Sequence, residues 1–76
     1  MTQQEAPFFD GARLRELRLR RGLRVEELAQ AAGITPRHVW RLEAGKRPRV
    51  AAVTVARLAQ ALGTSVDYLM HLSDQP

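Results

Sequence analysis

The segment 24–45 constrains the fold of this chain more than any other part of its sequence. Residues 25–32, Val-Glu-Glu-Leu-Ala-Gln-Ala-Ala, have the apolar spacing of a short helix, and Gly33 permits a sharp turn directly after it. A capping threonine and Pro36 follow, and proline is well suited to a first helical position because no N–H donor is needed there. The sequence therefore predicts two short helices, 25–32 and 36–44, that meet at a tight turn.

Similar signals predict three more helices and no strand. Asp10 is a good N-cap for the first of them, apolar residues form one stripe on the fourth helix of the chain, and Ser65 can cap the fifth. We therefore expect an all-α fold, a compact domain of five short helices. The predicted ranges are 11–21, 51–62 and 66 onward for these helices and 10–73 for the domain. Residues 1–9 are predicted to form a flexible N-terminal tail, and residues 74–76 a C-terminal tail.

The composition excludes several classes of protein. Seventy-six residues allow one small domain, and the absence of cysteine excludes disulfides, thiolate metal sites and cysteine nucleophiles. No apolar run approaches the ~20 residues that span a bilayer, and the N-terminus lacks the pattern of a secretory signal. No acid–base pair, metal-ligand spacing or Gly-rich phosphate loop is present. We therefore expect a cytoplasmic protein that is not an enzyme and uses no metal, cofactor or small-molecule ligand.

The basic residues are concentrated in one part of the chain. Residues 13–57 contain all twelve lysines and arginines but only four of the eight acidic residues. A field of this sign attracts polyanions, although a solvated basic surface without a partner would have the same composition. The overlap of this charge with the two-helix segment favours a nucleic-acid partner.

The outer face of the helix 36–44 carries the clearest candidate site. At about 100° per residue, Arg37 and Arg41 project almost opposite to Val39 and Leu42, which are the core-facing residues. Two helices joined by a tight turn can place the second helix in the major groove of DNA. There the two guanidinium groups can make bidentate contacts with guanine O6 and N7, or they can bind phosphates.

Three other residues lie beside these arginines. His38, on one flank, either contacts a base edge or phosphate or is simply a surface residue. Trp40, on the other flank, is predicted to be half-buried, where it either packs at the edge of the core or donates its indole N–H to a phosphate. Pro36 can offer an apolar contact, for example to a thymine methyl group. The candidate base-contacting residues are therefore Pro36, Arg37, His38 and Arg41.

Further polar residues are expected to meet the DNA backbone. Arg24 precedes the helix 25–32, whose free N–H groups also favour an anion, and a basic loop follows the helix 36–44. Such contacts add affinity with little sequence preference. The candidate phosphate-contacting residues are Arg24, Thr35, Trp40, Lys46, Arg47 and Arg49.

Glu43 requires a different explanation because it points close to the core. An unpaired carboxylate would be costly there. Arg18, one residue after the inward-facing Leu17, is the obvious partner. We predict a structural ion pair that connects the first helix to the third and fixes the orientation of the third.

These elements together resemble the Cro/C1-type (XRE-like) helix-turn-helix family of prokaryotic and phage transcriptional regulators. The resemblance covers roughly residues 10–72 and includes Leu14-Arg15-Glu16-Leu17-Arg18, Glu27-Leu28-Ala29, Ala32-Gly33-Ile34-Thr35, Leu42-Glu43-Ala44-Gly45 and Leu58-Ala59-Gln60-Ala61-Leu62-Gly63. It implies a five-helix, lambda-repressor-like domain, commonly dimeric, whose third helix reads an operator in double-stranded DNA. It also implies the pairing of Arg18 with Glu43. The chain departs from the family at Arg24-Val25, where a small polar cap and a phosphate-binding glutamine are usual.

A homodimer is expected because one short recognition helix reads too few base pairs to select a site in a genome. The apolar end of the chain, together with the end of the fourth helix, is the candidate interface, although these residues could instead close the monomer core. The proposed interface residues are Tyr68, Leu69, Met70 and Leu72. Bound to a palindromic operator, such a dimer would repress by steric exclusion or activate by contacting RNA polymerase.

One rival hypothesis is a protein-interaction module that keeps the helix-turn-helix fold without binding specific DNA. An acidic or neutral third helix would favour it, and the two arginines on that helix disfavour it. Among DNA-binding proteins, the sequence is compatible with a phage-type repressor, an antitoxin and a restriction–modification controller.

Overall fold

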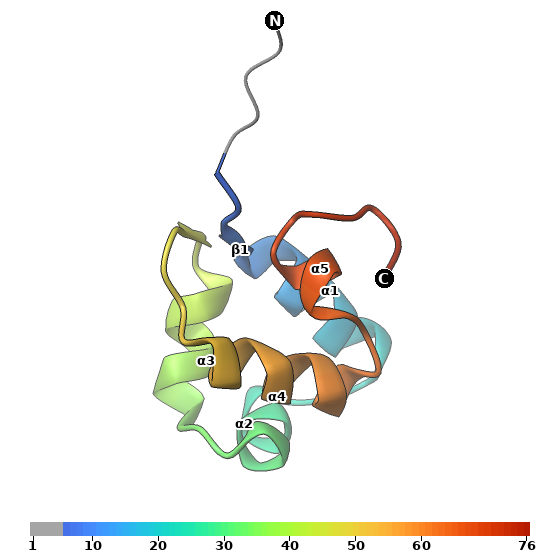
Figure 1. The fold of residues 1–76 in the computed structure, drawn as a ribbon. Coiled ribbons are helices and arrows are strands. Elements are labelled where there is room, and N and C mark those ends of the chain that lie inside the picture. Colours follow the sequence, from blue (N-terminus) through green and yellow to red (C-terminus); the bar gives the residue numbers. More distant parts are fainter. Residues whose placement is uncertain (1–5) are drawn as a thin grey trace, which may run out of the picture.

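The computed structural model describes residues 6–76, which form five helices and one pair of very short strands (Figure 1). Each helix begins within one or two residues of its predicted first residue. No helix among the described residues is both long and apolar enough to cross a membrane. In chain order the elements are β1 (Phe9–Asp10), α1 (Gly11–Arg20), α2 (Val25–Ala32), α3 (Pro36–Glu43), β2 (Lys46–Arg47), α4 (Ala52–Leu62) and α5 (Val66–Leu69).

The helices begin at polar side chains that accept hydrogen bonds from free backbone N–H groups. The Asp10 carboxylate accepts from the N–H groups of the first turn of α1, and the Thr35 hydroxyl accepts from His38 N at 3.1 Å. Ser65 does the same for α5. Gly33 ends α2 with a φ of 70°, a left-handed conformation that glycine adopts without strain. The caps and the turn predicted from the sequence are thus confirmed.

The two strands were not predicted. Phe9 pairs with Arg47 and Asp10 pairs with Lys46, so the start of the domain is joined to the loop that follows α3. Phe9 was assigned to a flexible tail over 1–9, but its side chain is fully buried, and this assignment was wrong for that residue. Two-residue strands have no periodicity to detect in a sequence. Residues 1–5 of the predicted tail lie outside the described residues.

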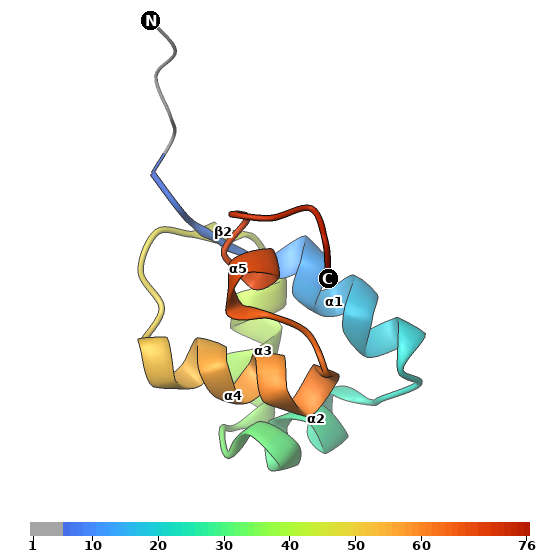
Figure 2. The same cartoon turned by 45° about the vertical axis from the view of Figure 1, so that its right-hand side comes forward.

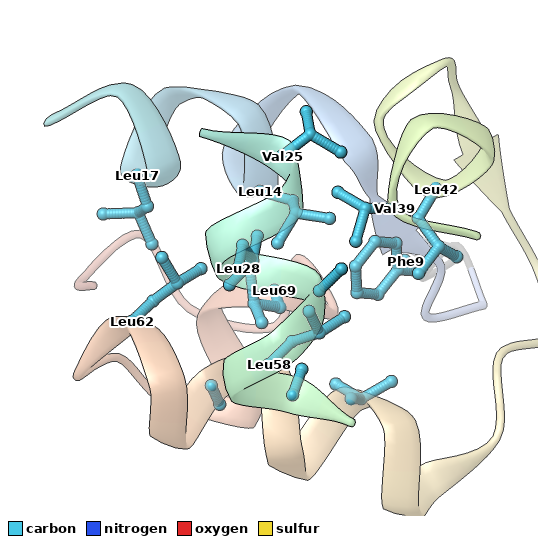
Figure 3. Close-up of a cluster of buried hydrophobic side chains, with 14 of the residues drawn as sticks. Phe9, Leu14, Leu17, Val25, Leu28, Val39, Leu42, Leu58, Leu62 and Leu69 are labelled. Carbon is cyan, nitrogen blue, oxygen red and sulfur yellow. The ribbon is translucent and has the colours of Figure 1, made fainter. Parts of the chain in front are cut away.

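One apolar core connects all five helices (Figure 3). Leucines of α1, α2, α4 and α5 meet at its centre, and Phe9 closes the side next to Val39 and Leu42 of α3. Burying an aliphatic side chain of this size contributes about 1.5–3 kcal/mol relative to leaving it exposed. The inner face of α3 is therefore firmly attached to the domain while its outer face remains free. Figure 2 shows α3 crossing behind α4, and the loop 44–51 runs from the end of α3 to the start of α4.

Gly11 allows α1 to begin directly against the end of α3. Its N–H donates to Gly45 O at 3.2 Å, and a Cβ atom at this position would lie 2.6 Å from Gly45 O and closer still to Leu42 O. These are backbone atoms, so rotation of a side chain cannot relieve the clash.

We expect Gly11→Ala to lower the free energy of unfolding by about 3 kcal/mol, because the backbone must shift to make room. Urea denaturation measures this change. Gly45→Ala is the matched control, since no atom lies within 4 Å of a Cβ there, and it should not destabilise the domain. Equal stability of the two variants would contradict the packing described here.

Candidate nucleic-acid interface

The outer face of α3 presents two arginines to solvent. Val39 and Leu42 are buried beneath it, whereas Arg37 and Arg41 are exposed, one turn apart. Among residues 6–76, no carboxylate lies within ion-pair distance of either guanidinium. Both side chains are therefore available to an anionic partner, as the helical spacing predicted.

The predicted ion pair between Arg18 and Glu43 is present beneath this face. Arg18 Nε donates to Glu43 Oε2 at 2.6 Å and Nη2 donates to Oε1 at 3.0 Å, and both side chains are at least nine-tenths buried. The hydrogen-bonded carboxylate raises the pKa of Arg18 above its ordinary value, although burial opposes this effect. Arg18 Nη1 also donates to Leu23 O at 2.9 Å. One side chain thus fixes α1, the end of α3 and the loop before α2 relative to one another.

The loop after α3 adds three basic residues beside the helix. Arg47 Nε donates to Arg41 O at 3.1 Å, so Arg47 also caps the last turn of α3. Arg41, Arg47 and Arg49 line a groove of about 200 Å³ that lies between α3, this loop and the start of α4. His38, half-buried, lines the same groove. The exposed face of α3 is therefore continuous with a basic, hollowed surface.

Comparison with known proteins identifies this arrangement. The family model described as a helix-turn-helix domain matches residues 11–72. The restriction–modification controller protein C.AhdI from Aeromonas hydrophila is similar over 78% of this chain and 88% of its own, with 40% identity and a TM-score of 0.70. The chain belongs to the Cro/C1-type helix-turn-helix family of transcriptional regulators. This membership places it among DNA-binding regulators and not among enzymes.

Two further structures extend the comparison. The clp gene regulator ClgR from Corynebacterium glutamicum is 35% identical, with 82% of this chain and 65% of that chain covered and a TM-score of 0.71. The P22 c2 repressor, solved in complex with a synthetic operator, is 24% identical, with coverage of 83% and 94% and a TM-score of 0.75. At this lower identity the likeness concerns the fold alone, and it agrees with the predicted lambda-repressor-like architecture.

Arg24 occupies a position at which this helix-turn-helix chain departs from its family. It is the N-cap of α2, and its backbone N–H donates to Glu27 Oε1 at 2.8 Å. This hydrogen bond from the backbone of Arg24 lowers the pKa of Glu27. The Arg24 guanidinium lies 3.4 Å from the same oxygen and is exposed. Its charge is partly balanced by Glu27, which distinguishes Arg24 from the arginines of α3.

Several other basic residues of the helix-turn-helix domain serve its structure. Arg13 is mostly buried, donates to the carbonyl oxygens of Tyr68 and Ser73, and lies over the Tyr68 ring at 4.4 Å. Arg21 Nε donates to Leu62 O at 3.0 Å. The sequence could not separate these residues from DNA-binding arginines, because their partners lie more than forty positions away in the chain.

Trp40 differs from its prediction. Helical geometry predicted a half-buried ring, but the residue is 59% exposed. The prediction assumed that neighbouring elements would cover the flank of α3. Among the described residues, the side chain of Trp40 forms no stacked pair, cation–π contact or hydrogen bond.

The predicted interface at the end of the chain also needs correction. Leu69 is fully buried and Tyr68 is 9% exposed, so both belong to the monomer core and have little surface for a partner. Val66, at the start of α5, is 41% exposed. The reason is that α5 is only one turn long and turns its second half inward. Of the four proposed interface residues, Leu72 is 59% exposed and Met70 is half-buried.

An interaction around Asp10 was not foreseen from the sequence. His71 Nδ1 lies 2.8 Å from Asp10 Oδ2, and the Phe8 ring stacks on His71 at 4.8 Å. Burial raises the pKa of Asp10, but the hydrogen bonds from His71, Arg13 N and Ala12 N outweigh this effect and lower it overall. The contact joins the two ends of the described chain on the side of β1.

Proposed function

We propose that this protein binds double-stranded DNA sequence-specifically in the cytoplasm, with α3 in the major groove, and that it regulates transcription from the operator it occupies. The observation that carries this proposal is the exposed pair Arg37 and Arg41, which lacks acidic partners within residues 6–76 and lies on a helix whose inner face is fixed to the core. A rigid helix with free guanidinium groups on its outer face meets the geometric requirement for reading base edges.

The base-contacting residues in this proposal are those of the first two turns of α3. Arg37 and Arg41 can each donate two hydrogen bonds to guanine O6 and N7. His38 faces the groove on the protein surface that Arg41, Arg47 and Arg49 also line, and it can contact a neighbouring base edge or phosphate. Pro36 begins the helix and is exposed, so it can offer only an apolar contact. Each bidentate pair provides about 1–3 kcal/mol of discrimination against the wrong base.

Most of the phosphate-contacting residues in this proposal flank α3 at its two ends. Lys46, Arg47 and Arg49 lie after its C-terminus, while Thr35 lies at its N-terminus and can donate its hydroxyl hydrogen because its oxygen accepts from His38 N. Arg24 and the indole N–H of Trp40 complete the proposed set. Contacts of this kind position the protein and make its affinity dependent on salt.

The functional form in this proposal is a homodimer on a palindromic operator, with Met70 and Leu72 at its interface. Leu72 is a large exposed apolar residue beside the end of α5, and burying it would be favourable. We expect sedimentation velocity to detect dimers at micromolar concentration, and Leu72→Asp to shift the population toward monomer. Val53→Asp is the matched control, because Val53 is equally exposed but lies in the first turn of α4. A wild-type monomer at these concentrations would contradict the interface.

Selection from a random duplex library, followed by sequencing of the bound pool, tests the proposed function. A palindromic consensus with half-sites about 10 base pairs apart supports a dimeric operator-binding regulator. Placing that operator upstream of, or across, a promoter in a reporter then determines whether the dimer represses by exclusion or activates through RNA polymerase. An unenriched pool would contradict sequence-specific binding and favour the interaction-module hypothesis.

A further inference from the structure

Trp40 is the exposed side chain that the proposed hydrogen-bonding contacts leave unexplained. The indole N–H can reach a phosphate, but this contact uses a single atom of a large ring, and the residue is 59% exposed. Pro36, also exposed, precedes Trp40 by four residues on α3, and residues at this spacing are neighbours on a helix surface. The two residues form an apolar ridge along α3, which we call the Pro36–Trp40 ridge.

The ridge lies beside the basic face and not apart from it. Trp40 lies one turn after Arg37 on the surface of α3, so a ligand that contacts Arg37 can also reach the indole ring. A partner for this surface therefore combines negative charge with an apolar group a few ångströms away. Among residues 6–76, no acidic side chain pairs with Arg37, Arg41, Lys46, Arg47 or Arg49, which favours a polyanion over a protein surface that is merely apolar.

We propose that the indole ring of Trp40 packs against the 5-methyl group of a thymine in the major groove, next to the bases that Arg37 and Arg41 read. The inference rests on the proposed function, because it needs α3 in the groove. The thymine methyl is the only apolar group that the base pairs present on the major-groove side. In this proposal Trp40 is a specificity-determining residue, and Pro36, one turn earlier on α3, extends the apolar surface beside it.

The proposal explains why a large apolar side chain stands on a solvent-facing recognition helix. If Trp40 contacted only phosphates, its ring would give up its hydration without gaining contact with an apolar group of the DNA. Against a methyl group, it removes apolar surface of both partners from water while its N–H stays at the edge of the groove, free to reach a phosphate. The expected half-site therefore contains a thymine within one or two base pairs of the guanines that the arginines contact.

Replacing thymine by deoxyuridine in the selected operator removes the methyl group and leaves the base pair intact. We expect this change at one position per half-site to weaken binding of the wild-type protein about fourfold for each methyl group lost from a contact. The same change outside the half-sites serves as the control and should have no effect. Fluorescence anisotropy of labelled duplexes measures both affinities.

The variant Trp40→Ala tests whether the effect of the thymine methyl group depends on the indole ring. It should bind the thymine operator more weakly than wild type and should no longer distinguish thymine from deoxyuridine, so that the two changes are coupled. The exposure of Trp40 makes the variant compatible with the fold, and circular dichroism verifies this. Because Trp40 is the only tryptophan, its emission also reports the contact directly and should shift more with the thymine operator than with random duplex.

Three outcomes would overturn the inference without affecting the proposed function. These are a consensus that lacks thymine in its half-sites, an equal affinity of the wild type for thymine and deoxyuridine operators, and a Trp40→Ala variant that is weakened equally on every sequence. The last result would assign Trp40 to the DNA backbone. A failure of the selection to enrich any sequence would instead contradict the proposed function, so the two failures are distinguishable.

Discussion

Replacing Arg37 and Arg41 together by alanine is expected to lower the affinity for the selected operator by about 100-fold or more, while affinity for random duplex falls far less. The reason is that, in the proposed complex, each guanidinium donates two hydrogen bonds to one guanine, and such a bidentate contact is worth about 1–3 kcal/mol at the specific site. Both side chains are exposed on a helix whose inner residues are buried, so the variant keeps its fold. Anisotropy titrations with the two kinds of duplex at one fixed salt concentration measure the effect.

Arg47→Ala is the control for this result. Arg47 lies in the loop after α3 and is proposed to contact phosphate, so its loss should weaken specific and random binding to a similar extent. It should also reduce the slope of log affinity against log salt by about one. If Arg37, Arg41 and Arg47 all produced the same uniform weakening, α3 could not be the element that reads the bases.

The second large effect is expected at the buried ion pair. Glu43→Ala should lower the free energy of unfolding by about 3–5 kcal/mol, because it leaves the Arg18 guanidinium largely buried without its carboxylate. A small domain has a total stability of roughly 5–15 kcal/mol, so such a loss removes a large fraction of it. Urea denaturation followed by circular dichroism measures the change.

The pair Arg20 and Glu16 supplies the matched control within the same chain. Its atoms approach to 2.7 Å, but both side chains are more than half exposed, and Glu16→Ala should cost less than about 1 kcal/mol. The double variant Arg18→Met with Glu43→Leu removes both charges and should be more stable than Glu43→Ala alone. Equal, small losses for Glu43→Ala and Glu16→Ala would contradict the structural role of the buried pair.

Local signals account for what could be predicted from the sequence. The caps at Asp10, Thr35 and Ser65 and the turn at Gly33 are read from single residues and their neighbours, and each is present. The ion pair of Glu43 was also predictable, because helical geometry directs this carboxylate to the core and a carboxylate there needs a partner.

The features that escaped prediction depend on contacts between distant parts of the chain. The pairing of Phe9 with Arg47 and the bond of Asp10 with His71 join segments more than thirty residues apart, and neither has a periodic pattern. The same limitation explains why Leu69 was placed in an interface and Trp40 at the edge of the core. Helical spacing gives the direction of a side chain, but only the packed structure determines what covers it.

We propose that Arg37 and Arg41 read guanines in the major groove from two copies of α3. Methylation interference at guanine N7 is the decisive test, because N7 lies on the major-groove edge and is one of the two acceptors of a bidentate arginine contact. On the selected operator, methylating the contacted guanines should prevent binding at two symmetric clusters about 10 base pairs apart. Interference should disappear at those positions in the Arg37→Ala, Arg41→Ala variant. Undiminished binding to DNA methylated at every guanine N7 would show that neither arginine contacts a guanine in the major groove.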